Sequence, residues 1–92
     1  MEHENPLQNF RSYPRINEAW ELQKTGLVVI DEALYKLELW HSISNPDVPY
    51  YVAVYVKDDG VWKQMQDAPF ATGLSGRDAL GAAMASLSER AA

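Results

Sequence analysis

The chain has 92 residues, 47% of them hydrophobic, and a formal net charge of −5. This composition predicts one globular domain with a core of its own and argues against a disordered chain. The acidic balance disfavours nucleic acids as partners, because phosphates attract basic surfaces. The chain has no Cys, which excludes disulfides, thiol nucleophiles and thiolate metal sites.

The sequence contains no apolar run long enough to cross a membrane as a helix. The longest one is Leu27–Ile30, whereas a spanning helix needs about 20 apolar residues. The first residues, Met1–Asn5, lack the basic region and apolar core of a signal peptide. We therefore expect a cytoplasmic protein with no membrane partner.

The N-terminal part divides into an arm and a helix. Residues 1–11 are polar with little periodicity and are predicted to be a flexible arm, and residues 12–92 are predicted to form a single α+β domain. Ser12 or Asn17 is a candidate cap for a first helix. Its apolar face would contain Ile16, Ala19, Trp20 and Gln23, with Gly26 as the stop.

The middle of the chain has the patterns of strands. Residues 27–30 are apolar and β-branched, and form either a short fourth strand or a loop. Residues 34–41 place Tyr35, Leu37 and Leu39 on one side and Trp40 among polar residues on the other. Residues 50–57 are the strongest strand, with alternate valines. A return strand is expected from Val61 to Gln66.

The turn at Asp58-Asp59-Gly60 leaves two registers open. A two-residue turn pairs Lys57 with Trp62 and puts Trp62 on the face of the tyrosines. A three-residue loop, with a left-handed Gly60 in a bulge, pairs Val56 with Trp62 and sends the indole into the core. We favour the bulged loop, because Asp-Asp-Gly suits a type I turn followed by a left-handed glycine. A one-residue slip reverses the side of every residue in the strand.

The last element is predicted as a helix. Ser75 is its cap, and Asp78 suits both a capping box and the helix dipole. The helix has an apolar stripe formed by Ala79, Leu80, Ala83, Met84 and Leu87. The expected fold class is α+β, in the order α-β-β-β-α, with two helices packed on one face of a three-stranded antiparallel sheet.

The sheet face away from the helices is the candidate binding site. If the valines and leucines lie under the helices, the opposite side is rich in aromatic residues, and such uncovered surfaces are typical of interfaces. The alternative is that the loop at residues 42–49 or the arm covers it. The candidate interaction residues are Lys36, Trp40, Tyr51, Tyr55, Lys57 and Trp62.

Signals for catalysis are sparse. His41 ends a predicted strand, and an enzyme using it would need a pocket and a nearby carboxylate. The two histidines, His3 and His41, have no spacing typical of a metal site. We expect no cofactor, no metal and no enzymatic activity.

Part of the chain resembles the double-stranded RNA-binding domain. The segments "YKLELW" and "YYVAVYV" are similar to its first two strands, and "GLSGRDALGAAMASL" to its Gly-Ser turn and second helix. The resemblance implies duplex RNA binding through a lysine cluster at the start of that helix. The matching positions are Gly76, Arg77 and Leu80, of which Arg77 alone is basic.

The sequence therefore predicts a small acidic regulatory or binding protein. Its expected partner is another protein or a second copy of itself, contacted through the aromatic face. Diverged RNA binding and a small enzyme using His41 are the alternatives.

Overall fold

The computed structural model describes residues 6–65 and 71–91 of the chain. It begins with a 3-10 helix, η1 (Pro6–Ser12), and continues into two long strands, β1 (Trp20–Ile30) and β2 (Ala33–Ser42). Strand β3 (Tyr50–Asp58) is followed by two short strands, β4 (Val61–Gln64) and β5 (Ala71–Gly73). The last element is an α-helix, α1 (Gly76–Ala91).

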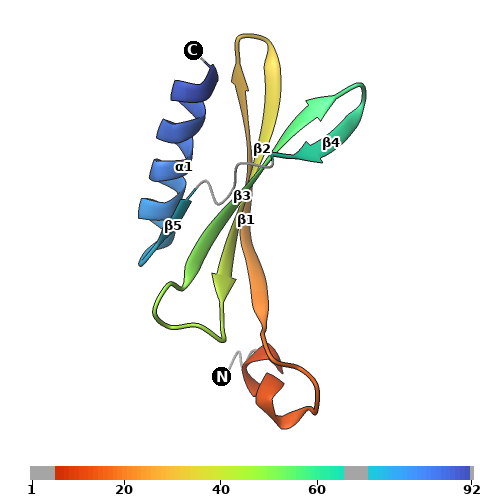
Figure 1. The fold of residues 1–92 in the computed structure, drawn as a ribbon, viewed down its shortest axis with the longest axis vertical. Coiled ribbons are helices and arrows are strands. Elements are labelled where there is room, and N and C mark those ends of the chain that lie inside the picture. The colour runs from red at the N-terminus through yellow and green to blue at the C-terminus, as the bar shows by residue number, and fades with distance from the viewer. Residues whose placement is uncertain (1–5, 66–70, 92) are drawn as a thin grey trace, which may run out of the picture.

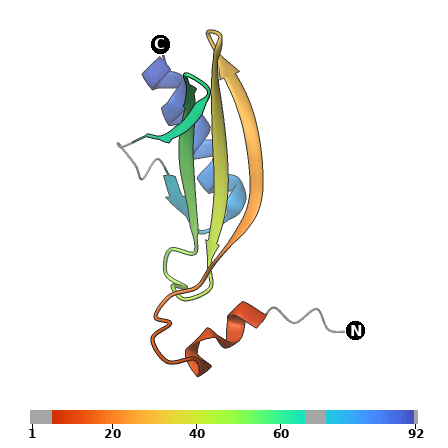
Figure 2. The same cartoon turned by 90° about the vertical axis from the view of Figure 1, so that its right-hand side faces the viewer.

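The strands form one antiparallel sheet in the order β1-β2-β3-β4, with β5 also paired to β3. Strands β4 and β5 share one edge of β3, because β4 pairs with its last residues and β5 with its first. Helix α1 packs on one side of the sheet, against β2, β3 and β5 (Figure 1). The opposite edge of the sheet is the long strand β1 (Figure 2).

The α+β class and the antiparallel sheet are confirmed, but the order α-β-β-β-α is wrong. Residues 20–30, expected to contain the end of a helix and a short strand, form one continuous strand. That strand pairs with β2 from Trp20↔Ser42 to Ile30↔Ala33, with a one-residue shift of register between Leu22 and Lys24. A helix of three turns is marginal without such packing. The backbone pairing of β1 with β2 therefore outweighs the weak helical periodicity of this segment. Only one of the two predicted helices, α1, covers the sheet.

The β1–β2 and β3–β4 hairpins each turn through two residues with positive φ, which is the type I′ geometry. Asp31 and Glu32, with φ of 49° and 71°, join β1 to β2. Asp59 and Gly60, with φ of 55° and 78°, join β3 to β4. The favoured three-residue loop is therefore wrong.

The two-residue turn decides the side on which each residue of β4 lies. Lys57 pairs with Trp62 and Tyr55 with Gln64, so Trp62 lies on the face of the tyrosines. Met65, next along the chain, donates its backbone N–H to the Val54 carbonyl at 2.9 Å and packs against the core. The twist of a type I′ turn matches that of the flanking strands, which favours this register.

The core lies between α1 and the valine side of the sheet, as the alternating patterns predicted. Its buried residues are Leu37, Leu39, Val52, Val54, Ala79, Ala83 and Leu87. Met84, expected in the buried stripe, is 51% exposed. Helix α1 packs mainly on β3 and β5 and also contacts β2, and no second helix of the described residues covers β1.

Small residues allow α1 to approach the sheet closely. The Ser75 hydroxyl caps the helix by accepting the backbone N–H of Asp78 at 3.1 Å, as predicted. A Cβ added at Gly76 would lie 2.8 Å from Leu39 Cδ2, so a larger residue where the helix begins would require the Leu39 side chain to move. In the described part of the chain, neither helix combines the length and hydropathy required to cross a bilayer.

Candidate binding face

The candidate site is the side of the sheet opposite α1, called here the open face. Directly paired residues of antiparallel strands point to the same side, and Leu37↔Val54 marks the helix side. The alternate pairs therefore lie on the open face. They bring together all six candidate interaction residues, in the pairs Lys36↔Tyr55, Trp40↔Tyr51 and Lys57↔Trp62.

Among the described residues, neither the loop after β2 nor η1 lies across the open face. Figures 1 and 2 show η1 beyond the end of the sheet, where Phe10 is buried and lines a cleft with Tyr13, Ala19 and Trp20. The loop folds back on the N-terminal segment, since Ile43 donates its N–H to the Ala19 carbonyl at 2.8 Å. The described arm and loop thus reach only the end of the face near Trp20.

Three aromatic side chains from three adjacent strands form an open cleft on this face. Trp20 of β1, Trp40 of β2 and Tyr51 of β3 line it, and its volume is about 390 Å³. The rings of Trp20 and Tyr51 meet edge to face, with centroids 6.3 Å apart, which is a favourable arrangement for aromatic pairs. Trp20 remains 37% exposed, so the cleft presents apolar ring surface to solvent.

Glu38 connects the aromatic residues from the middle of the face. Its Oε1 accepts the indole N–H of Trp40 at 3.2 Å, and its Oε2 lies 3.6 Å from Lys36 Nζ. Burial raises the pKa of the Tyr55 phenol, and the negative charge and hydrogen bond of Glu38 raise it further. One carboxylate thus holds a tryptophan, a tyrosine and a lysine in fixed positions.

The two lysines of the open face lie over aromatic rings. Lys36 Nζ is 4.8 Å from the ring centroid of Tyr55 and 4.9 Å from that of Trp62. Lys57 Nζ is 5.5 Å from the Trp62 centroid. At these distances a cation is attracted to the π-face. The aromatic and charged side chains also close over Ala53, which lies on the open face yet is 2% exposed.

Strand β1 adds residues to the open face that the sequence analysis missed. Trp20 and Leu22 were assigned to a helix or left out, although both are exposed beside Trp40. Leu27 and Val29 continue the row and are 60% and 67% exposed. The signal that could have found them is the run from Thr25 to Ile30, rich in β-branched residues, which suits a strand better than a helix.

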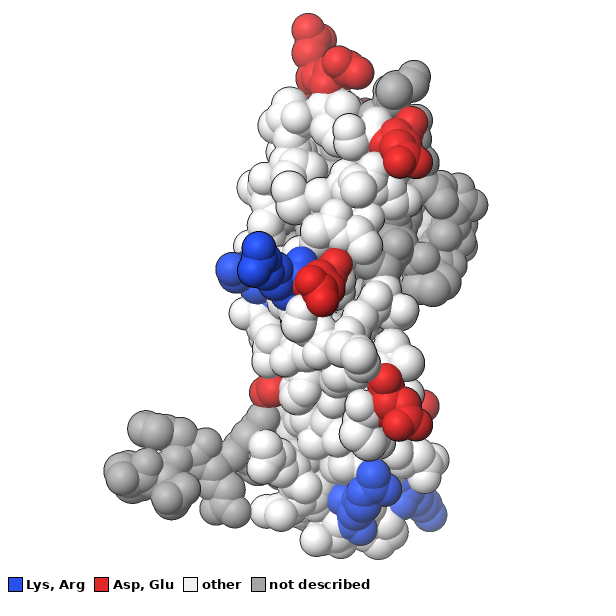
Figure 3. Space-filling model, turned by 90° about the vertical axis from the view of Figure 1, so that its left-hand side faces the viewer, with Lys and Arg blue, Asp and Glu red and all other residues white. Residues whose placement is uncertain are grey.

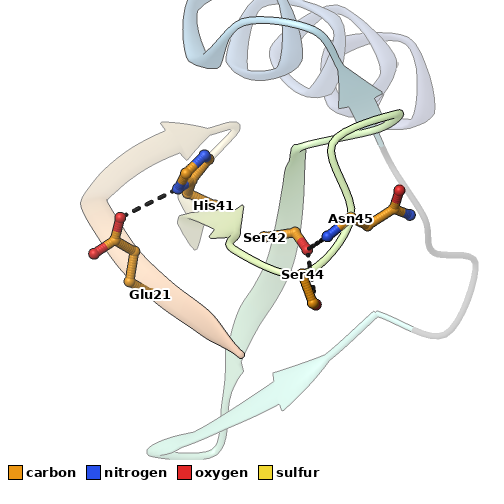
Figure 4. A network of polar contacts seen from close by, with 5 residues as sticks. All are labelled: Glu21, His41, Ser42, Ser44 and Asn45. Atoms are coloured by element: carbon orange, nitrogen blue, oxygen red, sulfur yellow. Dashed lines mark hydrogen bonds and ion pairs between the residues drawn. The ribbon is translucent and has the colours of Figure 1, made fainter. Parts of the chain in front are cut away.

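A carboxylate lies beside His41, on the helix side of the sheet. His41 Nδ1 lies 3.1 Å from Glu21 Oε1 (Figure 4). The imidazole is 4.9 Å from the ring of Tyr50. A carboxylate accepts hydrogen bonds only, so the proton of the neutral imidazole is held on Nδ1. The next hydroxyl, Ser42, points to the opposite face of β2. Glu21 therefore orients the imidazole of His41, but Ser42 is not within reach of that imidazole.

Ser42 instead belongs to a network that fixes the loop after β2. Its Oγ accepts the Asn45 N–H at 2.9 Å and lies 3.3 Å from Ser44 Oγ (Figure 4). Ser44 reaches the N-terminal segment, accepting the Ala19 N–H at its Oγ and an Arg11 N–H at its carbonyl. These polar contacts are all satisfied within the protein, which is the arrangement of a structural support.

On the helix side, charge is spread in small groups of both signs over the described residues (Figure 3). Arg77, the basic residue of the RNA-binding resemblance, lies here with Lys24 in a groove beside α1, away from the aromatic face. Among the described residues, no three His, Asp or Glu side chains gather as a metal site would require. Comparison with known proteins finds no matching family model, no matching curated protein and no matching solved structure.

Proposed function

We propose that this protein acts without catalysis, by binding another protein through the open face. The observation that carries the proposal is the cleft between Trp20, Trp40 and Tyr51, which exposes apolar ring surface on a sheet face that no described element covers. Tryptophan and tyrosine in such positions dominate the binding energy of protein interfaces. The cleft has the size to accept one apolar side chain of the partner.

The surroundings of the cleft support a protein partner over a nucleic acid. Lys36 and Lys57 are attracted by neighbouring rings, and Lys36 lies 3.6 Å from the Glu38 carboxylate. The charge of Lys36 is thus partly offset within the face by Glu38. Binding to phosphates needs a surplus of positive charge, whereas this chain has a net charge of −5. An apolar cleft with charged side chains beside it is the anatomy of a protein interface.

The test is selection of binders from a displayed library of random peptides, using the whole chain as bait. We expect the enriched peptides to share an aromatic or aliphatic anchor residue. Their affinity should fall at least tenfold for Trp40→Thr and for Tyr51→Thr, because truncating a central aromatic residue commonly costs more than about 1.4 kcal/mol. Threonine retains the strand propensity of both positions.

The control is Val61→Thr, which removes an exposed apolar side chain from the helix side of β4. This variant should bind the selected peptides as the wild type does. Circular dichroism and thermal melting of each variant separate lost binding from lost folding. Peptides without a common anchor, or an equal loss in the control, would count against the open face.

Duplex RNA binding remains the alternative, and one observation bears on it. Lys24 and Arg77 line the same groove at the start of α1, so two cations meet where the resemblance implies a basic cluster. This alternative predicts salt-dependent binding of a short RNA duplex, weakened by Arg77→Ala and unchanged by Trp40→Thr. The proposed function predicts no such binding at physiological salt.

A further inference from the structure

The two edges of the sheet differ in how well they are protected from further pairing. One edge is made of the short strands β4 and β5, four and three residues long. The other is β1, eleven residues long and without proline. Natural proteins shorten, charge or cover such edges, because their unpaired N–H and C=O groups accept another strand. The six residues from Thr25 to Ile30 carry no charge, and no described element lies outside them (Figure 2).

The backbone of this segment is set up for antiparallel pairing. In an antiparallel ladder, alternate residues direct their N–H and C=O groups to the partner strand and the others direct them away. Ile30 and Ala33 close the two-residue turn and exchange the hydrogen bond of a type I′ turn. By alternation, the groups of Thr25, Leu27 and Val29 point away from β2, along the free edge.

We propose that a second copy of this chain pairs with this edge, antiparallel, about a two-fold axis at Leu27. Such an arrangement places Leu27 opposite itself and Thr25 opposite Val29, so apolar and β-branched residues meet on the open face. An isologous contact of this kind closes as a dimer. The inference concerns the edge of the sheet and is independent of the function proposed for its aromatic face.

Charge complementarity at both ends of the paired segments favours a second copy of this chain as the strand that pairs with β1. The same register puts Lys24 opposite the second copy's Ile30, beside its turn at Asp31 and Glu32. Lys24, Asp31 and Glu32 form no ion pair with any described residue of their own chain. Two-fold symmetry repeats the contact at the other end, so each lysine meets an acidic turn. The axis is normal to the sheet, so both aromatic clefts lie on one side of the dimer.

Light scattering during size exclusion of the full chain tests the association. We expect a mass of two chains at high concentration and of one chain on dilution. Leu27→Pro should abolish the dimer and leave the circular dichroism spectrum unchanged, because proline is tolerated on an edge strand whose N–H faces solvent. The mass of one chain at every concentration, or a dimer that survives Leu27→Pro, would overturn the proposal.

A cysteine variant tests the same pairing if Leu27→Pro fails to fold. The chain has no Cys, so Leu27→Cys introduces a single thiol. Paired residues exchanging hydrogen bonds have Cα atoms about 5.5 Å apart, which a disulfide spans. Mild oxidation should therefore link Leu27→Cys into a dimer, while Val61→Cys on the other edge stays monomeric. Equal linking at both positions would show random collision instead.

Charge exchange tests the register. Lys24→Glu should weaken dimerisation at least fivefold, because it places three acidic groups together at each end. The double variant Lys24→Glu with Glu32→Lys should restore it. No effect of Lys24→Glu, or no rescue by the double variant, would contradict the Leu27-centred pairing.

Discussion

Lys57 on β3 lies directly opposite Trp62 on β4, with its ammonium nitrogen 5.5 Å from the centre of the indole ring. This pair exists only because the chain turns through Asp59 and Gly60 alone. A third loop residue would move Trp62 to the helix side and leave both lysines of the open face without that ring. A single turn thus determines the composition of the candidate binding face.

The first prediction concerns Gly60. Its φ of +78° lies in the left-handed region, although a Cβ there would meet no atom within 4 Å. Gly60→Ala should therefore lower the free energy of unfolding by about 1–2 kcal/mol through backbone strain alone. Asp59→Asn should be neutral or slightly stabilising, because Asn-Gly is the preferred type I′ pair. Urea denaturation measures both, and equal stability of Gly60→Ala and the wild type would argue against this turn.

The second prediction compares two glycines of α1. A Cβ at Gly76 would lie 2.8 Å from Leu39 Cδ2, in the core, whereas one at Gly81 meets nothing within 4 Å. Gly76→Ala should destabilise the protein by about 1–3 kcal/mol through overpacking. Gly81→Ala should stabilise it by about 0.5–1 kcal/mol, since alanine is the better helix former. Thermal melts of the two variants should therefore shift in opposite directions.

The third prediction concerns Tyr55 at alkaline pH. Burial, assisted by Glu38, raises the phenol pKa above its usual value of 10.0. A raised folded-state pKa means that the neutral phenol contributes stability fully below about pH 10, and that this contribution is lost as pH rises through the folded pKa. Spectroscopic titration of the tyrosines should show one late phenol that disappears in Tyr55→Phe.

Glu38→Gln separates the causes of that shift. This variant should lower the Tyr55 pKa without returning it to the usual value, because burial is the larger cause and remains. A Tyr55 titration identical to that of the wild type would show that the carboxylate has no part in it.

The fourth prediction measures the contact between Lys36 and Trp62, whose ring centroid lies 4.9 Å from the ammonium nitrogen. A double-mutant cycle with Lys36→Met and Trp62→Leu should give a coupling energy of about 0.5–1 kcal/mol, typical of an exposed cation–π contact. The cycle cancels the separate contacts of Lys36 with Glu38 and Tyr55. A coupling indistinguishable from zero would mean that the two side chains do not interact in solution.

Local sequence patterns predicted the structure correctly where they agreed with the packing of the whole fold. The alternation in residues 34–41 and 50–57 correctly separated the valine side from the tyrosine side, because a side chain's side in a strand follows from the period of two. The Ser75 cap was equally readable, since capping depends on neighbours along the chain. Five of the six candidate interaction residues follow from these patterns alone: Lys36, Trp40, Tyr51, Tyr55 and Lys57.

Only the tertiary structure decided the two features that complete the site. Residues 20–30 carry a weak helical period and a β-branched tail, and their pairing with all of β2 selects the strand. This adds Trp20 to the cleft and creates the long free edge. The face on which Trp62 lies likewise depends on whether the turn has two residues or three, and the local sequence allows both turns. Both outcomes depend on contacts between segments, whose energy no single stretch of sequence contains.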